Sequence, residues 1–317
     1  MGEWFFPAWD PVLLQIGFLQ LRWYSLMYVV GFVVGHWILT RLAKSGFFPV
    51  PAEKVSDLVF ALILGVMLGG RIGYCVFYRP ELIASWRLIA VWEGGLSFHG
   101  GLLGVVVTAI VWSRRQRIST WRLLDCLALA VTPGILAVRL ANFVNGELYG
   151  RTTDASVPCA MRFPTDPVAL QRLGIPAGAG IRERETAIMA AIEDGTWAEI
   201  RDTVPLRHPS QLYEALGEGV ILGLVMLVCY RVSRHRPWGR GVYGGIFALG
   251  YGAVRFVIEY FRQPDAQFRD PDDPLGTVLG PLTMGQVLCA AMILFGVGLI
   301  MWAWNRRDPV AQEAVDG

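Results

Sequence analysis

The sequence has few charged residues for its length. Aspartate, glutamate, lysine and arginine make up 17% of the 317 residues, whereas 54% are hydrophobic, and the mean hydropathy is positive. Soluble domains usually carry about 25% charged residues. The shortage of charge excludes an ordinary soluble domain and indicates an integral membrane protein.

Motifs for nucleotides and for thiolate-bound metals are also missing. The sequence contains neither a P-loop nor a GxGxxG motif after a strand, so nothing in it indicates ATP, and we expect no nucleic acid partner. The five cysteines have no CxxC spacing, and four of them fall in predicted helices. We therefore expect no metal, no cofactor and no internal disulfide.

Long apolar runs dominate the chain instead. An α-helix needs roughly 20 apolar residues to cross the hydrocarbon core of a bilayer. Runs of about that length cover residues 24–40, 56–78, 96–112, 121–144, 211–230, 241–261 and 283–304. The sequence thus predicts an all-α integral membrane protein with about seven transmembrane helices.

The basic residues of the loops predict an orientation. Most of them lie in alternate connections, near residues 41–54, 114–122, 231–240 and 306–307. Cytoplasmic loops are enriched in lysine and arginine, so we expect the N-terminus outside and the C-terminus in the cytoplasm. The segment "MGEWFFPAWD" has neither the basic region nor the cleavage site of a signal peptide, and we expect the first helix to be retained.

A polar stretch separates the fourth and fifth apolar runs. It is too polar to span a membrane and predicts a small extracytoplasmic insertion with one or two short helices. The expected organisation is an extracytoplasmic arm at 1–23, helices one to four at 24–150, the insertion at 151–207, helices five to seven at 208–305 and a cytoplasmic tail at 306–317.

Polar side chains gather where the fourth apolar run ends, in "RLANFVNGELYGR". At about 100° per residue, Arg139, Asn142, Gly146 and Glu147 fall within an arc of roughly 140°. An arginine in a membrane-spanning helix costs about 2.5–3.5 kcal/mol on insertion scales, so it normally faces a partner or a cavity. This face is therefore a candidate functional site.

A second polar stripe lies in "YGAVRFVIEYFR". Tyr251, Arg255, Glu259 and Arg262 fall within about 80° of one another on a helix. Arg71 is a third intramembrane arginine beside Arg139 and Arg255. Arg255 and Glu259 can neutralise each other, but with two nearby carboxylates for three guanidiniums we expect unpaired positive charge, which an anionic ligand would balance.

Two histidines near the expected outer interface are candidate bases. His99 lies between glycines in "LSFHGGLLG", where small residues allow close approach of a substrate. His208 precedes "PSQLYE". This segment is as consistent with an ordinary helix start as with a catalytic site. Arginines bind phosphate oxygens bidentately, so a site with these groups in the outer leaflet suits an anionic phospholipid.

The motifs "HGGLLG", "RLANFVNGELYGR", "HPSQLYE" and "YGAVRFVIEYFRQPD" occur in this order. In these motifs and their order the chain resembles the prolipoprotein diacylglyceryl transferase family, from "RWYSLMY" to the last helix. The resemblance implies a transferase of the bacterial inner membrane with its active site near the periplasmic leaflet. Its substrates would be phosphatidylglycerol and the signal peptide of a prolipoprotein, whose lipobox cysteine receives the diacylglyceryl group while glycerol phosphate leaves.

The resemblance also implies roles for single residues. Arg139 would bind the lipid phosphate with support from Arg255, and His99 would act as the base, with His208 as its rival. The other matching positions would shape the same site; they are Tyr24, Asn142, Asn145, Glu147, Gly150, Tyr251 and Glu259. We expect the two glutamates to orient arginines.

Two other classes of function fit part of the sequence. A lipid transporter would also line a cavity with arginines, but its polar groups should be spread through the membrane depth. A receptor that only binds lipoprotein precursors would use the extracytoplasmic insertion, yet it would have little use for buried arginines.

Overall fold

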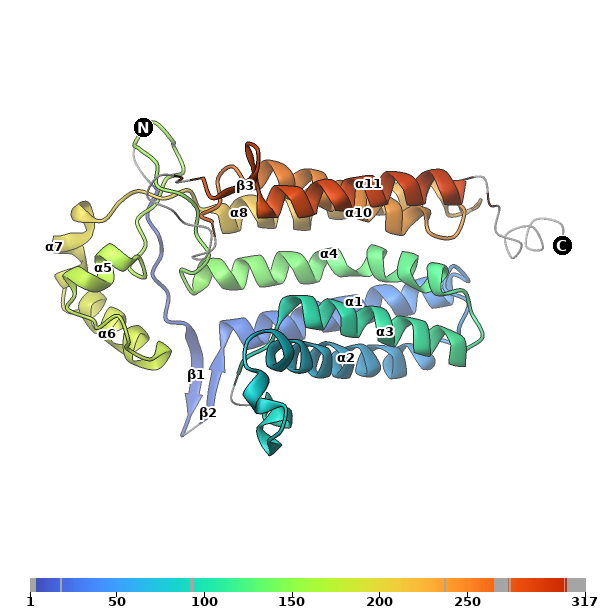
Figure 1. Cartoon of the computed structure of the whole chain (residues 1–317), viewed down its shortest axis with the longest axis horizontal. Coiled ribbons are helices and arrows are strands. Elements are labelled where there is room, and N and C mark those ends of the chain that lie inside the picture. The colour runs from blue at the N-terminus through green and yellow to red at the C-terminus, as the bar shows by residue number, and fades with distance from the viewer. Residues whose placement is uncertain are drawn as a thin grey trace. The chain divides into compact units, whose positions relative to one another are not determined.

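The computed structural model describes residues 4–17, 19–91, 94–236, 238–264, 273, 275–304 and 306. Seven helical segments occur at the predicted places (Figure 1). They are α1 (Trp23–Lys44), α2 (Lys54–Phe77), α3 (Phe98–Arg115), α4 (Thr120–Val144), the continuous run α8 (Ser210–Glu214), η5 (Ala215–Ile221) and α9 (Leu222–Ser233), then α10 (Val242–Ile258) and α11 (Met284–Trp304). The predicted tail at 306–317 lies outside the described residues except for Arg306.

Five of these segments are long and apolar enough to cross a membrane. They are α1, α2, α4, the run from Ser210 to Ser233, and α11; α10 is a shorter apolar helix. The mostly helical, membrane-spanning architecture predicted from the apolar runs is thus confirmed.

Two short antiparallel hairpins accompany the helices. Strand β1 (Val12–Ile16) pairs with β2 (Leu19–Arg22), which leads directly into α1 (Figure 1). Strand β3 (Thr277–Leu279) pairs with β4 (Leu282–Thr283) immediately before α11. The sequence analysis does not predict them, because strands of two to five residues carry too little pattern to be recognised.

The insertion, here called the head (residues 151–207), contains three short helices where the sequence predicts one or two. They are α5 (Pro167–Arg172), α6 (Ile181–Glu193) and α7 (Thr196–Ile200). Asp166 caps α5 by accepting from the Val168 amide at 2.9 Å, and its other oxygen accepts from Arg207 Nε at 2.8 Å. This buried pair joins the start of α5 to the last residue of the head.

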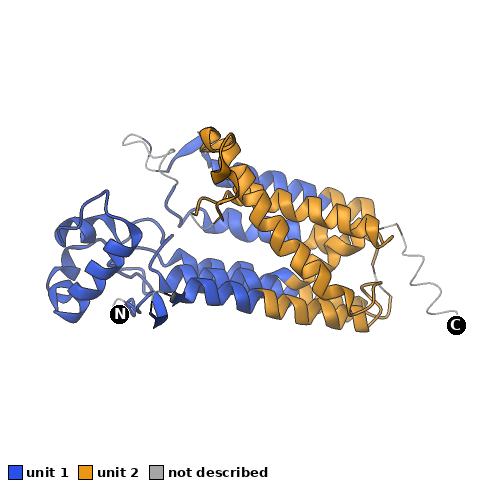
Figure 2. Cartoon of the chain, turned by 90° about the horizontal axis from the view of Figure 1, so that it is seen from below, with its two compact units in different colours: residues 1–31, 131–225, 247–297 blue, residues 32–130, 226–246, 298–317 orange. Residues whose placement is uncertain are grey.

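Two compact units divide the chain (Figure 2). Unit 1 contains residues 1–31, 131–225 and 247–297, and unit 2 contains 32–130, 226–246 and 298–317. The arm, the head and the polar ends of α4, α8 and α10 belong to unit 1.

Within unit 2, α2 and α3 pack through glycines spaced four residues apart. Gly69 and Gly73 of α2 face Gly100 and Gly104 of α3. A Cβ on Gly73 would lie 2.7 Å from the Cα of Gly100, and a Cβ on Gly69 would lie 2.9 Å from the Cα of Gly104. Small residues at this spacing let two apolar helices approach closely and replace lipid contacts with helix contacts.

Unit 2 also anchors α10 through a buried carboxylate. Asp125 of α4 accepts hydrogen bonds from the backbone amides of Gly241 and Gly244 at 2.8 and 2.9 Å. The first amides of a helix have no intrahelical partners, so this carboxylate satisfies donors that would otherwise be unpaired in an apolar environment.

The glycine packing predicts that two glycine-to-alanine substitutions differ in their effect on stability. In Gly100→Ala the new methyl would meet the backbone of Gly69 and Gly73, so we expect destabilisation of about 1–3 kcal/mol. Gly298→Ala in α11 is the matched control, because no atom lies within 4 Å of its Cβ position. Thermal unfolding in detergent measures both variants, and equal melting temperatures would contradict the close packing of α2 and α3.

Candidate active site

One buried carboxylate lies at the centre of the polar cluster of unit 1. Glu214, at the end of α8, is 1% exposed. Its Oε2 lies 2.8 Å from Arg139 Nη1, and its Oε1 lies 2.6 Å from Arg255 Nη1 and 3.6 Å from Arg262 Nε. A single side chain of α8 therefore contacts guanidinium groups from α4 and from the end of α10.

A second carboxylate contacts Arg139 from the next turn. Glu218 is fully buried, and its Oε2 lies 3.2 and 3.3 Å from Arg139 Nη2 and Nε. It belongs to η5, a stretch of π-helix. Such wider turns are rare and occur often at functional sites. Arg139 is consequently held between Glu214 and Glu218.

The third carboxylate belongs to the stripe predicted on α10. Glu259 Oε2 lies 3.2 Å from Arg255 Nη2, and its Oε1 accepts from the Thr283 hydroxyl at 3.2 Å. Tyr251 lies on α10, two turns earlier than Glu259. The predicted grouping of Arg139, Arg255 and Glu259 is therefore present.

The predicted excess of positive charge in this cluster was wrong. Arg139, Arg255 and Arg262 meet three buried carboxylates, those of Glu214, Glu218 and Glu259. Arg71, the third arginine of that expectation, donates to backbone carbonyls. The motif "HPSQLYE" is consistent with a helix start, and neither Glu214 nor Glu218 belongs to the two predicted polar stripes. The four-residue spacing of two glutamates in the otherwise apolar "EALGE" was the available signal, since such residues share a helix face.

The Asn142–Glu147 segment forms a tight loop at the end of α4. Asn142 Nδ2 donates to Glu147 Oε1 at 2.9 Å, and Gln211 Nε2 donates to the Glu147 carbonyl at 2.7 Å. In the described part of the chain Glu147 thus contacts Asn142 and Gln211, not an arginine as expected. Asn145 is half-buried in the same loop.

Gly150 follows this loop and approaches His208. Its amide donates to the His208 carbonyl at 2.8 Å, and a Cβ at Gly150 would lie 2.9 Å from the Cβ and the carbonyl oxygen of His208. Only glycine fits this contact without a shift of the backbone. Tyr24, at the start of α1, lies with its hydroxyl 3.5 Å from that of Tyr28.

The two candidate bases have different surroundings. His208 is half-buried in unit 1, with Nδ1 3.2 Å from the Tyr213 hydroxyl, which in turn lies 3.0 Å from Cys159 Sγ. Burial lowers the pKa of His208, and Asp154 opposes this effect. His99 is the second residue of α3 in unit 2 and is exposed.

Arg71, the remaining intramembrane arginine, binds backbone carbonyls. It is 3% exposed in unit 2, where its guanidinium donates to the carbonyls of Arg87 and Gly94 at 2.5 Å and of Leu88 at 3.2 Å. The arginine therefore holds the irregular segment that precedes α3. It is a structural group, and its partners are backbone carbonyls that sequence patterns do not reveal.

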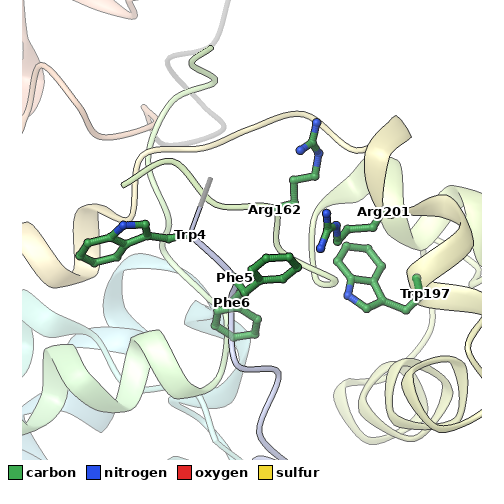
Figure 3. A pocket seen from close by; sticks show the side chains of 7 residues that line it. Trp4, Phe5, Phe6, Arg162, Trp197 and Arg201 are labelled. Atoms are coloured by element: carbon green, nitrogen blue, oxygen red, sulfur yellow. The ribbon is translucent and has the colours of Figure 1, made fainter. Parts of the chain in front are cut away.

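A separate pocket of about 320 Å³ lies between the arm and the head of unit 1 (Figure 3). Phe5 stacks against the Arg201 guanidinium at 4.4 Å from its ring centre, and Trp197 lies beside them (Figure 3). Arg162 completes the cationic part of the lining. Among the residues with described positions, no three His, Cys, Asp or Glu side chains come together to hold a metal ion.

Comparisons with known proteins agree with these motifs. The family model described as "Prolipoprotein diacylglyceryl transferase" matches residues 11–302. The chain is 41% identical over 308 residues to the phosphatidylglycerol–prolipoprotein diacylglyceryl transferases of Shigella boydii serotype 4 (strain Sb227) and Escherichia coli (strain K12 / DH10B), and each alignment covers 96% of both chains. The chain belongs to the prolipoprotein diacylglyceryl transferase family.

Proposed function

We propose that this chain transfers the diacylglyceryl group of phosphatidylglycerol to the lipobox cysteine thiol of prolipoproteins. A thioether forms and glycerol phosphate leaves. The observation that carries the proposal is the 41% identity over 96% of the chain to transferases named for these two substrates. The buried arginine cluster of α4, α8 and α10 supports it, since it supplies cationic groups for a lipid phosphate.

The proposed chemistry is displacement at a glycerol carbon. The precursor thiol loses its proton to a base, and the thiolate attacks the carbon that bears the phosphate oxygen. As the carbon–oxygen bond breaks, negative charge grows on the departing phosphate. Arg139 and Arg255 would stabilise that charge, and their carboxylate partners hold both guanidiniums in place before the lipid arrives.

Phosphate binding would use the donors of Arg139 that its carboxylate partners leave over. Its guanidinium spans Glu214 and Glu218 in the structure, with all three nitrogens engaged. A guanidinium has five N–H donors, so a lipid phosphate would accept from those that remain while both carboxylates keep the side chain oriented. Tyr24, Asn142, Asn145, Glu147, Gly150, Tyr251 and Glu259 would form the remainder of this substrate site.

We assign the base to His99 and a structural role to His208. His99 is exposed at the start of a helix held by glycine packing and by Arg71, so it is accessible to a substrate. His208 is engaged with Gly150 through its backbone and with Tyr213 through its ring. His208 is the alternative base if His99 is dispensable.

The proposed topology has seven membrane spans, with the arm and head in the periplasm and the tail in the cytoplasm of a bacterial inner membrane. The basic loops near 114–122 and 231–240 support this orientation. It puts the ends of α4 and α10 and the beginning of α8 near the periplasmic leaflet.

Loss of Arg139 should abolish most transfer. We expect Arg139→Ala to lower kcat by about 10²-fold or more, because a fixed charge at the developing anion is removed. Mass spectrometry of a lipobox peptide incubated with phosphatidylglycerol vesicles measures the added diacylglyceryl mass. Arg172→Ala, on the exposed face of α5, is the matched control and should retain wild-type activity. A folded wild-type protein that yields no modified peptide would contradict the transferase proposal and favour lipid transport.

The two histidines can be separated by the same assay. We expect His99→Gln to lower transfer by about 10²-fold or more, as removal of a general base does, whereas His208→Gln keeps activity within about tenfold. His235→Gln, in an exposed loop, controls for the substitution itself. A larger loss in His208→Gln than in His99→Gln would reverse the assignment.

A further inference from the structure

Buried amide oxygens without partners lie beside the arginine cluster. Asn142 is 2% exposed and Gln211 is fully buried. Within the described residues, Gln211 Oε1, Asn142 Oδ1 and Asn145 Oδ1 accept no hydrogen bond, although the Asn142 side chain also lies within hydrogen-bonding reach of the Tyr24 hydroxyl. A buried acceptor left without a donor costs free energy, so these atoms are expected to meet a donor in the working protein.

The contacts of the two buried amides determine that the oxygen of each amide, and not its nitrogen, lacks a partner. Asn142 Nδ2 donates to the Glu147 carboxylate, and Gln211 Nε2 donates to the Glu147 backbone carbonyl. Both partners only accept, so each amide must present its nitrogen to Glu147 and keep its oxygen for another donor. The missing partner is therefore a hydrogen-bond donor.

Helix geometry relates these oxygens to the arginines. Asn142 follows Arg139 by three residues on α4, and Gln211 precedes Glu214 by three residues on α8. Residues three apart share a helix face, about one turn apart along the axis. Since Glu214 pairs with Arg139 and Arg255, both amides lie about one turn beyond the guanidiniums, toward the end where α4 ends and α8 begins.

We propose that the amide oxygens of Asn142 and Gln211 accept hydrogen bonds from the hydroxyls of the glycerol headgroup of phosphatidylglycerol. This inference rests on the proposed function. The lipid phosphate joins the diacylglycerol on one side to the headgroup on the other. With the phosphate at Arg139 and Arg255, the headgroup extends toward the aqueous end, where the amides lie.

The pair of amides makes the site selective for a hydroxylated headgroup. Two hydroxyl donors on neighbouring carbons match two acceptors that both border Glu147. A headgroup without hydroxyls would leave both oxygens unpaired, and sites built around hydrogen bonds discriminate strongly against ligands that lack the group. Gln211, which the sequence analysis did not single out, thus becomes a specificity residue.

The test compares two lipids of the same charge and acyl chains in the full-length protein. Phosphatidylglycerol and phosphatidylpropanol, which lacks the headgroup hydroxyls, are supplied in separate vesicles with one lipobox peptide. For the wild type we expect kcat/KM about 10²-fold or more lower with phosphatidylpropanol. For Gln211→Met we expect a loss of about tenfold with phosphatidylglycerol and none with phosphatidylpropanol, so the ratio between the lipids shrinks.

The outcomes separate this inference from the proposed function. Equal transfer from both lipids by the wild type would overturn headgroup recognition but leave the proposed transferase activity standing. This comparison uses the wild type alone, so it does not depend on whether a variant folds. Equal losses for both lipids in Gln211→Met, or a higher KM for the peptide alone, would also overturn it by showing a structural or peptide-binding role. Gln171→Met, on the surface of α5, should leave both rates unchanged. Absence of product from either lipid would instead refute the transferase proposal, and the inference with it.

Discussion

The contact of the Glu214 carboxylate with three guanidinium groups is the interaction on which the polar part of unit 1 depends. It joins α4, α8 and the end of α10 through Arg139, Arg255 and Arg262. A buried guanidinium without a partner is costly in an apolar environment, and so is a buried carboxylate. Each group is therefore tolerable only because the others lie around it. The arrangement couples the packing of three helices to the position of the charges.

This coupling explains how the proposed phosphate site can persist without a net positive charge. Glu218 holds Arg139 from the π-helical turn, and Glu259 with Thr283 holds Arg255. The cations are thus oriented by protein groups and need little reorganisation when charge develops on a phosphate. One turn away along α4 and α8, Glu147 orients the amides of Asn142 and Gln211 in the same way, because it accepts from both of their nitrogens.

Much of the architecture was predictable because its signals are local. The apolar runs predicted helices within a few residues of α1, α2, α4 and α11, since hydrocarbon thickness sets their length. The spacing of Arg255 and Glu259 also revealed their contact. The hairpins β1–β2 and β3–β4 and the third head helix were not predicted, because short elements are stabilised by neighbours distant in the sequence.

The sequence by itself determined the membrane class, the helices and the identity of the polar groups, because hydrophobic length and helical spacing are properties of contiguous residues. Only the tertiary structure decided which charges meet. The partners of Arg139 lie 75 and 79 residues away on another helix, and Arg71 is satisfied by carbonyls that every residue carries. Ion pairing depends on distances of a few ångströms between side chains, and those distances exist only once the helices have packed.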